Sequence, residues 1–444
     1  MFNFKTHSRT MLLCSATATI LALGPAIANS AEPVPNTPQL HQLTYSKVYI
    51  SMLGTELLPI DDAPTGQGNN GHIPLGSPED EESPLTFYAA KKVFDAVEDV
   101  ADGLGPVYNA QACRECHQSP MSGGSSQVTV VRAGRMNNGK FVDHAGGSLI
   151  QDRAIHYSLQ EQVQDGNDIT ALRLSLSILG DGFVEAVSDD TLLAIAAAQP
   201  ADMRGEAVMV EVLEGSGIKR VGRFGWKSQH ASLLSFAVDA YLNEMGITSP
   251  LMPDENTSNG KSVAAYDTVA DPEEEASAQY PFGRDVHAFT NFMRSLKAPA
   301  RNDATTQTQA IIDGQALFTQ IGCSNCHTPA MVTSPPGTLL NGGTFTVTEA
   351  LGNKRIRPFS DFLLHDIGTG DGIYQTGSAE ARNKMRTAAL WGLHTRARFM
   401  HDGLSLTLGN AIQRHQGQAL SARKAFHQLT SDQQAKVLAF LRSL

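Results

Sequence analysis

The sequence predicts a mainly α protein with two similar halves, small β insertions and long loops. A stretch with helical apolar spacing, followed directly by a Cys-x-x-Cys pair, occurs twice, and the pairs begin at Cys113 and Cys323. Long alternation of apolar and polar residues, which is typical of half-buried strands, is scarce. Only 128–131 and 207–212 indicate small sheets. With 444 residues, the chain can form two or three domains, each with its own core.

The N-terminus has the order of a secretory signal peptide. Lys5 and Arg9 precede an apolar run that ends in small residues, and we expect cleavage after Ala28. The alternative is a membrane anchor, but Gly24 and Pro25 interrupt the apolar stretch. No later stretch approaches the roughly 20 apolar residues of a spanning helix, so we expect no membrane span after cleavage. The sequence therefore predicts an exported, periplasmic protein.

Composition divides the rest of the chain. The polar stretch 36–82, rich in Gly and Pro, predicts an extended arm lying over the first domain. A cap and proline at Ser83-Pro84, with helical apolar spacing from Ala90 to Val100, predict one helix that ends at Gly103. The acidic stretch 253–281, which includes the run 271–275, suits a solvated connection between domains. The predicted regions are a signal peptide at 1–28, an extended arm at 29–82, a first domain at 83–252, a linker and interdomain segment at 253–300, and a second domain at 301–444.

The two cysteine pairs are each followed by a histidine, in Cys113-Arg114-Glu115-Cys116-His117 and in Cys323-Ser324-Asn325-Cys326-His327. Cys-x-x-Cys-His is the attachment signature of c-type haem: the thiols bond to the haem vinyl groups, and the histidine reaches the iron. The signature predicts two haem c groups, with His117 and His327 as proximal ligands. Zinc, local disulfides and a redox-active dithiol are the alternatives. One zinc seldom draws on pairs this far apart, and it would leave both histidines unexplained. A redox-active dithiol should lie in a βαβ unit, and the sequence predicts none around either motif.

A sixth iron ligand is predicted near the C-terminus. Thr407 is a plausible helix cap, and the apolar stripe that follows it ends at His415. A histidine on an apolar face is usually a packed core residue, but a nearby haem favours His415 as the distal ligand. Met400 and His401 compete for that role.

Two helices complete this second, cytochrome c-like domain. One is predicted at 311–321, before the motif. The last begins at Ser431, with Gln434 in a capping box. Together they give the two-helix frame of a small cytochrome c domain.

Several landmark segments make the chain resemble the bacterial dihaem oxidoreductases, which are related to dihaem cytochrome c peroxidases and to the methylamine-utilisation dihaem enzyme. The segments are 103–106, 146–152, 222–227, 360–366, 386–392 and 401–403. The resemblance implies bis-histidine ligation of the C-terminal haem by His327 and His415. It also implies that electrons pass from this haem to a reactive haem in the N-terminal half. A calcium ion is a further candidate cofactor.

The N-terminal haem has only weak candidates for a distal ligand. His230 is favoured because it follows Trp226 and precedes the apolar pattern of a helix. The other candidates are His144, His156, His287, Met121, Met136 and Met203. Trp226 and Trp391 could lie between the haems or simply pack in the core. No catalytic residue is predicted.

The leading hypothesis is a periplasmic, peroxidase-like dihaem oxidoreductase that acts on hydrogen peroxide and exchanges electrons with a small redox protein. The alternatives are a dihaem cytochrome c that only transfers electrons, and an accessory redox enzyme acting on a partner protein. The formal net charge of −11 argues against a nucleic-acid partner.

Overall fold

A computed structural model describes residues 61–65, 86–273, 275–302 and 308–444. The chain divides into two units, 1–57 and 58–444, and every described residue belongs to the second. The predicted signal peptide, most of the predicted arm and the predicted helix start at Ser83 lie outside the described residues. Within the described ranges, no helix is both long enough and apolar enough to cross a membrane.

The described part is a mixed structure in which helices are accompanied by six small sheets, instead of the mainly α structure predicted. The difference has a simple cause. Most strands are two or three residues long, which is too short to show a period of two in the sequence. The predictions at 128–131 and 207–212 are confirmed by the strands β3 (Thr129–Asn137) and β8 (Met209–Glu211).

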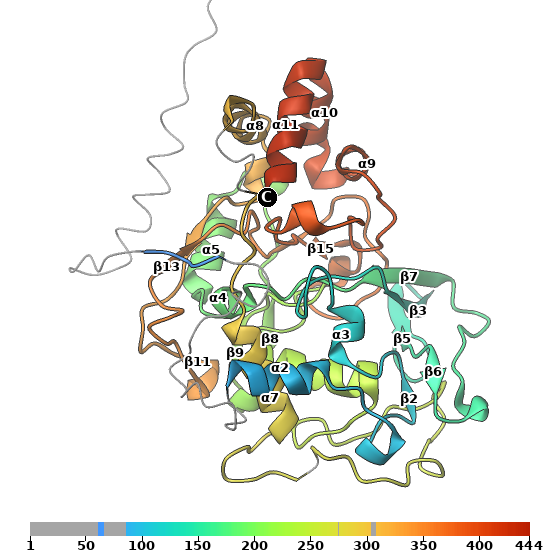
Figure 1. The fold of residues 1–444 in the computed structure, drawn as a ribbon. Coiled ribbons are helices and arrows are strands. Elements are labelled where there is room, and N and C mark those ends of the chain that lie inside the picture. The colour runs from blue at the N-terminus through green and yellow to red at the C-terminus, as the bar shows by residue number, and fades with distance from the viewer. Residues whose placement is uncertain (1–60, 66–85, 274, 303–307) are drawn as a thin grey trace, which may run out of the picture. The chain divides into compact units, whose positions relative to one another are not determined.

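The first half is framed by two helices that pack together, α2 (Phe87–Asp95) and α7 (Arg284–Ser295), seen side by side in Figure 1. Their contact includes the rings of Phe94 and Phe292, whose centroids are 4.5 Å apart. The α2 helix begins after Thr86, whose hydroxyl accepts a hydrogen bond from Ala89 N at 3.2 Å.

The predicted helix from Ser83 to Gly103 is too long. Helical dihedrals end at Ala96, which is extended with ψ 143°, and the Glu98 amide bonds instead to the Gln111 carbonyl at 2.8 Å. Val97 and Val100 are exposed, so their apolar spacing does not reflect a buried face.

The α7 helix lies inside the predicted linker 253–300, and its apolar face belongs to the main core. The acidic run before it is not simply solvated, because Asp271 and Glu273 are both buried. Asp271 accepts a hydrogen bond from the Thr248 hydroxyl at 2.8 Å. Such a contact depends on the tertiary fold and cannot be read from composition.

The second half is framed in the same way by α8 (Gln309–Gln320) and α11 (Ser431–Ser443). The rings of Phe318 and Phe440 lie 5.3 Å apart. The predicted helix pair is confirmed, but the capping box lies one residue earlier than predicted, between Thr430 and Gln433. Figure 1 shows α9 (Leu408–Gln413) and α10 (Leu420–Gln428) close to this pair.

The remaining elements connect and cover these frames. The remaining helices are α3 (Cys113–Cys116), α4 (Asp181–Glu185), α5 (Asp189–Ala198) and α6 (Leu233–Ala240), which continues as a π-helix at Tyr241–Met245. The largest sheet joins β3 to β4 (Lys140–Asp143), β5 (Leu149–Ile150) and β7 (Ile169–Leu174). The short strands are β2 (Val107–Tyr108), β6 (Arg153–Ala154), β9 (Lys219–Val221), β10 (Met331–Val332), β11 (Leu339–Leu340), β12 (Phe345–Thr346), β13 (Lys354–Ile356), β14 (Leu364–His365) and β15 (Met385–Arg386).

The described part of the predicted arm contacts the C-terminal half. Strand β1 (Asp61–Asp62) pairs in parallel with β13, and Arg357 Nη1 lies 2.9 Å from Asp62 Oδ1. Over these residues, the prediction that the arm lies on the first domain is wrong, because the basic residues that pair with its acidic strand belong to the second half.

Candidate functional site: two cavities with cysteine pairs

Each Cys-x-x-Cys-His motif lines its own cavity, and the two cavities are of similar size, about 190 Å³ and 170 Å³. The larger cavity, here called the C-cavity, is lined by Cys323, Cys326 and His327. The smaller one, the N-cavity, is lined by Cys113, Cys116 and His117. Because the pairs open into different cavities, they cannot share one zinc ion. Burial raises the pKa of both Cys113 and Cys323 to about 12, whereas a reactive dithiol needs a lowered pKa.

His327 and His415 face each other in the C-cavity, with ring centroids 6.5 Å apart. Each ring is fixed by its Nδ1, which donates to a backbone carbonyl: His327 to Phe359 at 2.9 Å and His415 to Ala411 at 2.8 Å. Such a hydrogen bond leaves Nε2 as the lone-pair nitrogen of each ring. Metal–imidazole bonds are about 2 Å long, so the spacing suits one metal ion held between the two rings.

Electrostatics favour the neutral, ligating form of both histidines. Burial, and then the neighbouring His415, lower the pKa of His327 to about 4. Burial also lowers the pKa of His415. The competing candidates Met400 and His401 line the same cavity, but the His401 ring packs edge-on against Trp226 at 6.1 Å.

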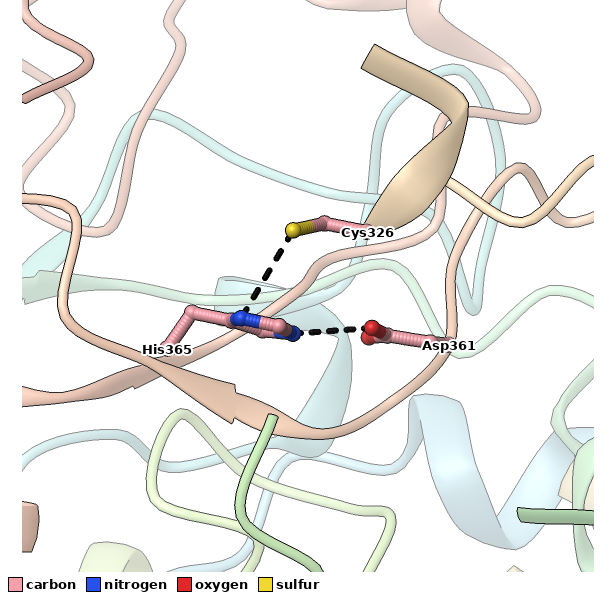
Figure 2. A group of neighbouring side chains, drawn as sticks. All are labelled: Cys326, Asp361 and His365. Atoms are coloured by element: carbon pink, nitrogen blue, oxygen red, sulfur yellow. Dashed lines mark hydrogen bonds and ion pairs between the residues drawn. The ribbon is translucent and has the colours of Figure 1, made fainter. Parts of the chain in front are cut away.

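A buried group of three side chains stands at the wall of the C-cavity. Figure 2 shows Cys326, His365 and Asp361 in a row, with His365 Nδ1 3.6 Å from Cys326 Sγ and Nε2 2.8 Å from Asp361 Oδ2. Within the part of the chain that the structure describes, these three side chains form the one group of three or more His, Cys, Asp or Glu residues close enough to share a metal ion. Cys326 belongs to the haem motif, so we assign the group to the C-cavity and not to a separate metal centre. His365 and Asp361 both lie in the landmark segment 360–366, but no role in the site was predicted for either residue.

The N-cavity holds His117 in a similar way, with Nδ1 3.3 Å from the Gly124 carbonyl, and burial lowers the pKa of His117. None of the histidines predicted as its distal ligand is among the described residues that line it. His230 Nε2 lies 3.2 Å from Asp239 Oδ2, and His144 Nε2 accepts a hydrogen bond from the Gln164 amide at 3.2 Å. His156 stacks on Tyr266.

The remaining candidates are also elsewhere. His287 stacks on Phe282, Met121 packs against the main core and Met136 belongs to β3. Met203 lines the C-cavity, not the N-cavity. Two methionines that the sequence did not single out, Met245 and Met293, do line the N-cavity.

Sequence reasoning also missed the polar wall of the N-cavity, which includes Asp239 and Glu244. Burial raises the pKa of Glu244, and its Oε2 accepts a hydrogen bond from Asn109 Nδ2 at 2.8 Å. Burial also acts to raise the pKa of Asp239, but His230, Arg132 and Asn243 together outweigh burial and lower it. The one available signal was position: both carboxylates lie in or just after the predicted helix that follows His230.

A thin wall separates the two cavities. Residues 174–176 and Trp226 line both of them. The wall is held by Trp226 Nε1, which donates to the Leu174 carbonyl at 2.7 Å, and by the Ser175 hydroxyl, which donates to the Cys116 carbonyl at 2.5 Å. Trp391 is buried in the core and is absent from the described linings of both cavities.

The residues of both cavities fit a covalently held haem. Each supplies two thiols, a histidine kept neutral by burial, and a largely apolar lining, which is the environment that c-type haem requires. The C-cavity adds a second histidine, and the 6.5 Å between the two ring centroids leaves room for one iron between the rings.

Comparison with known families agrees with this class of site. Residues 150–444 match the family described as "Di-haem oxidoreductase, putative peroxidase". The chain belongs to this di-haem oxidoreductase family, as its resemblance predicted. The family description implies two haems, while the first motif lies before the matched residues.

Comparisons with individual proteins add little. Hydrazine synthase of Kuenenia stuttgartiensis is 14% identical over 96% of this chain and 100% of that one, with a TM-score of 0.39. A MauG-like protein associated with microbial copper homeostasis is 17% identical over 54% of this chain and 79% of that one, with a TM-score of 0.29. At these scores we draw nothing from either likeness. No curated protein matches the chain.

Proposed function

We propose that the protein is a periplasmic, peroxidase-like di-haem oxidoreductase. In this proposal Cys323 and Cys326 hold an electron-transfer haem, and Cys113 and Cys116 hold the haem at which hydrogen peroxide is reduced. A small redox protein is the proposed electron donor. Haem iron, when bound, supplies the electron transfer and the redox chemistry. Family membership supports the oxidoreductase class.

The difference between the cavities supports the assignment of roles. His327 and His415 would together hold one haem iron, which would then supply electron transfer. In the N-cavity, by contrast, His117 is the sole histidine among the described lining residues, and the wall contains carboxylates. An open axial position beside a proton donor is what peroxide reduction needs.

Glu244 is the proposed proton donor and acceptor. Burial raises its pKa, so it holds a proton at a higher pH than an ordinary carboxyl group and can release it to a leaving oxygen. Asp239 is less suitable, because its interactions with His230 and Asn243 keep it ionised. Trp226 would lie between the two redox centres, since it lines both cavities.

A second candidate is a di-haem cytochrome that only transfers electrons. Met245 and Met293 favour it, because either thioether could close the remaining axial position in the N-cavity. An accessory enzyme acting on a partner protein would need the same open position as a peroxidase. We do not propose a calcium site from the described residues.

Electron paramagnetic resonance and absorption spectra of the purified, haem-loaded protein separate these candidates. The peroxidase-like proposal expects one low-spin centre and one high-spin or openable centre in the oxidised or half-reduced state. Two low-spin centres in every redox state would favour the electron carrier, and M245A and M293A would then identify the ligand by restoring a high-spin signal.

A further inference from the structure

Two arginines on neighbouring strands line the N-cavity. Arg132 belongs to β3 and Arg173 to β7, and these strands pair antiparallel with Val130 opposite Arg173. Because side chains alternate along a strand, Val130, Arg132 and Arg173 face the same side of the sheet. This side forms a wall of the N-cavity, and it comes from different elements than the motif cysteines on α3.

Two cations at and behind this wall share one carboxylate. Asp371 Oδ2 lies 2.8 Å from Arg173 Nε, and Asp371 Oδ1 lies 2.8 Å from Lys227 Nζ. One buried carboxylate therefore serves two buried cations. Arg132 is a third cation nearby, and its charge acts on the carboxylates of Asp143, Asp239 and Glu244. Burial, followed by the charge of Arg132, lowers the pKa of Arg173 to about 10. Burial lowers the pKa of Lys227 to about 8, with Arg173 and Arg132 adding repulsion against the attraction of Asp371.

Both guanidinium groups have enclosed N–H donors that lack an acceptor. Arg132 Nη1 donates to the Ser148 hydroxyl at 2.9 Å, but its Nε has no partner among the described residues. Arg173 donates to Asp371 and Gln375, while its Nη2 has no partner within the same ranges. A buried unpaired donor lowers stability, and a charged one lowers it more. Two guanidinium groups on one face of the sheet, each with an unused N–H donor, are suited to binding an anion.

We propose that Arg132 and Arg173 form an anion site in the N-cavity, and that this site takes the propionate carboxylates of the haem attached at Cys113 and Cys116. Haem bears its vinyl groups and its propionates on opposite edges, so a porphyrin anchored through the vinyls directs its carboxylates away from the cysteines. Guanidinium groups bind carboxylates through paired, charge-assisted hydrogen bonds. The inference depends on the proposed function only for the haem at the first motif, and not for peroxide chemistry.

The test compares R132Q with R135Q in the haem-loaded protein. Arg135 is an exposed arginine on the same strand and is not part of the described cavity lining, so it is a matched control. Loss of the Arg132 charge leaves the negative charge of a propionate less neutralised. The added negative charge near the haem stabilises the oxidised iron. We expect the redox equilibrium to shift about tenfold toward the oxidised form, which lowers the reduction potential by about 59 mV for a one-electron couple. We also expect a changed propionate vibration in the resonance Raman spectrum. R135Q should change neither.

The other outcomes overturn the proposal. An unchanged potential and an unchanged propionate vibration in R132Q would exclude the contact. A potential that depends on added phosphate in the unmodified protein, but not in R132Q, would show that the site binds a free anion instead of haem. If R132Q fails to mature, R132K replaces it, because it keeps the charge but loses the paired geometry, and a smaller shift in the same direction is expected. Peroxide turnover of the unmodified protein is a separate measurement. If that turnover is absent while R132Q still shifts the potential, only the peroxidase proposal is refuted.

Discussion

The two cavities have nearly the same frame around the motif histidine and differ in what lies beyond it. The ring centroids of Phe94 and His117 lie 6.4 Å apart with an interplanar angle of 56°. Those of Phe318 and His327 lie 6.1 Å apart with an interplanar angle of 53°. Each phenylalanine belongs to the helix before the motif and packs on the closing helix of its half. The C-cavity then presents His415, whereas the N-cavity presents the carboxylates of Asp239 and Glu244. A common frame thus supports two chemistries, and the segments outside the frame decide which.

The largest expected effect comes from removing the feature that distinguishes the C-cavity. H415A should convert one low-spin centre to high-spin, because His327 would be left as the single axial ligand. Spectra of the oxidised protein measure this change. H401A is the control, since His401 lines the same cavity but packs against Trp226. A spectrum that changes in H401A and not in H415A would reverse the assignment.

The next effect concerns the N-cavity alone. E244Q should lower peroxide turnover by about 10²- to 10⁴-fold, the usual contribution of a general acid or base. Because the protonated carboxyl is the donor and its pKa is raised, turnover should fall as the pH rises through that pKa, and E244Q should lose this dependence. E211Q, at an exposed position on β8, should behave like the unmodified protein. Full activity in E244Q would mean that another group moves the proton.

A smaller effect is expected where the cavities meet. W226F should slow electron transfer from the C-cavity centre to the N-cavity centre, because the indole lies between them and its hydrogen bond to Leu174 is lost. Rapid-mixing spectroscopy of the half-reduced protein measures the rate. W391F removes a core indole that is not part of either described lining, so it should affect stability more than transfer. Equal slowing in both variants would argue against a specific path.

The smallest effects test the frame itself. A Cβ added at Gly314 would lie 2.1 Å from the Lys436 carbonyl, so G314A should lower the free energy of unfolding by about 1–3 kcal/mol, as overpacking usually does. A Cβ at Gly409 meets nothing within 4 Å. G409A should therefore stabilise the protein by about 0.4–1 kcal/mol, because alanine lowers the conformational entropy of the unfolded chain. Denaturant titration checks both. Similar effects of the two variants would show that the two frame helices can move apart.

Local signals predicted one half of this comparison better than the other. The frame helices at 311–321 and 431–444 and the helix cap at Thr407 follow from spacing and cap residues, which act within one or two turns. The same spacing placed His415 on the face that meets the C-cavity. These features are encoded by residues close together in the sequence.

The N-cavity could not be predicted in this way because its walls come from distant segments. Arg173 forms an ion pair with Asp371, which lies in the other half of the chain. Asp271 is buried and accepts a hydrogen bond from Thr248, although its neighbours in the sequence are acidic. The composition of 253–281 therefore indicated a linker, although α7 within the predicted linker closes the first frame. Periodicity identified the helix that contains Asp239, but not the cavity that it borders.

The partition at 174–176 has a consequence for how the protein is assembled. Its amide at Leu174 donates to the His401 carbonyl at 2.6 Å on one side, and the Ser175 hydroxyl holds the Cys116 carbonyl on the other. The same three residues line both cavities, so a displacement of this segment changes both linings. A haem bound in either cavity would thus fix the wall that it shares with the other cavity. We therefore expect the two haems to load cooperatively, and the half-loaded protein to be a minor species during maturation.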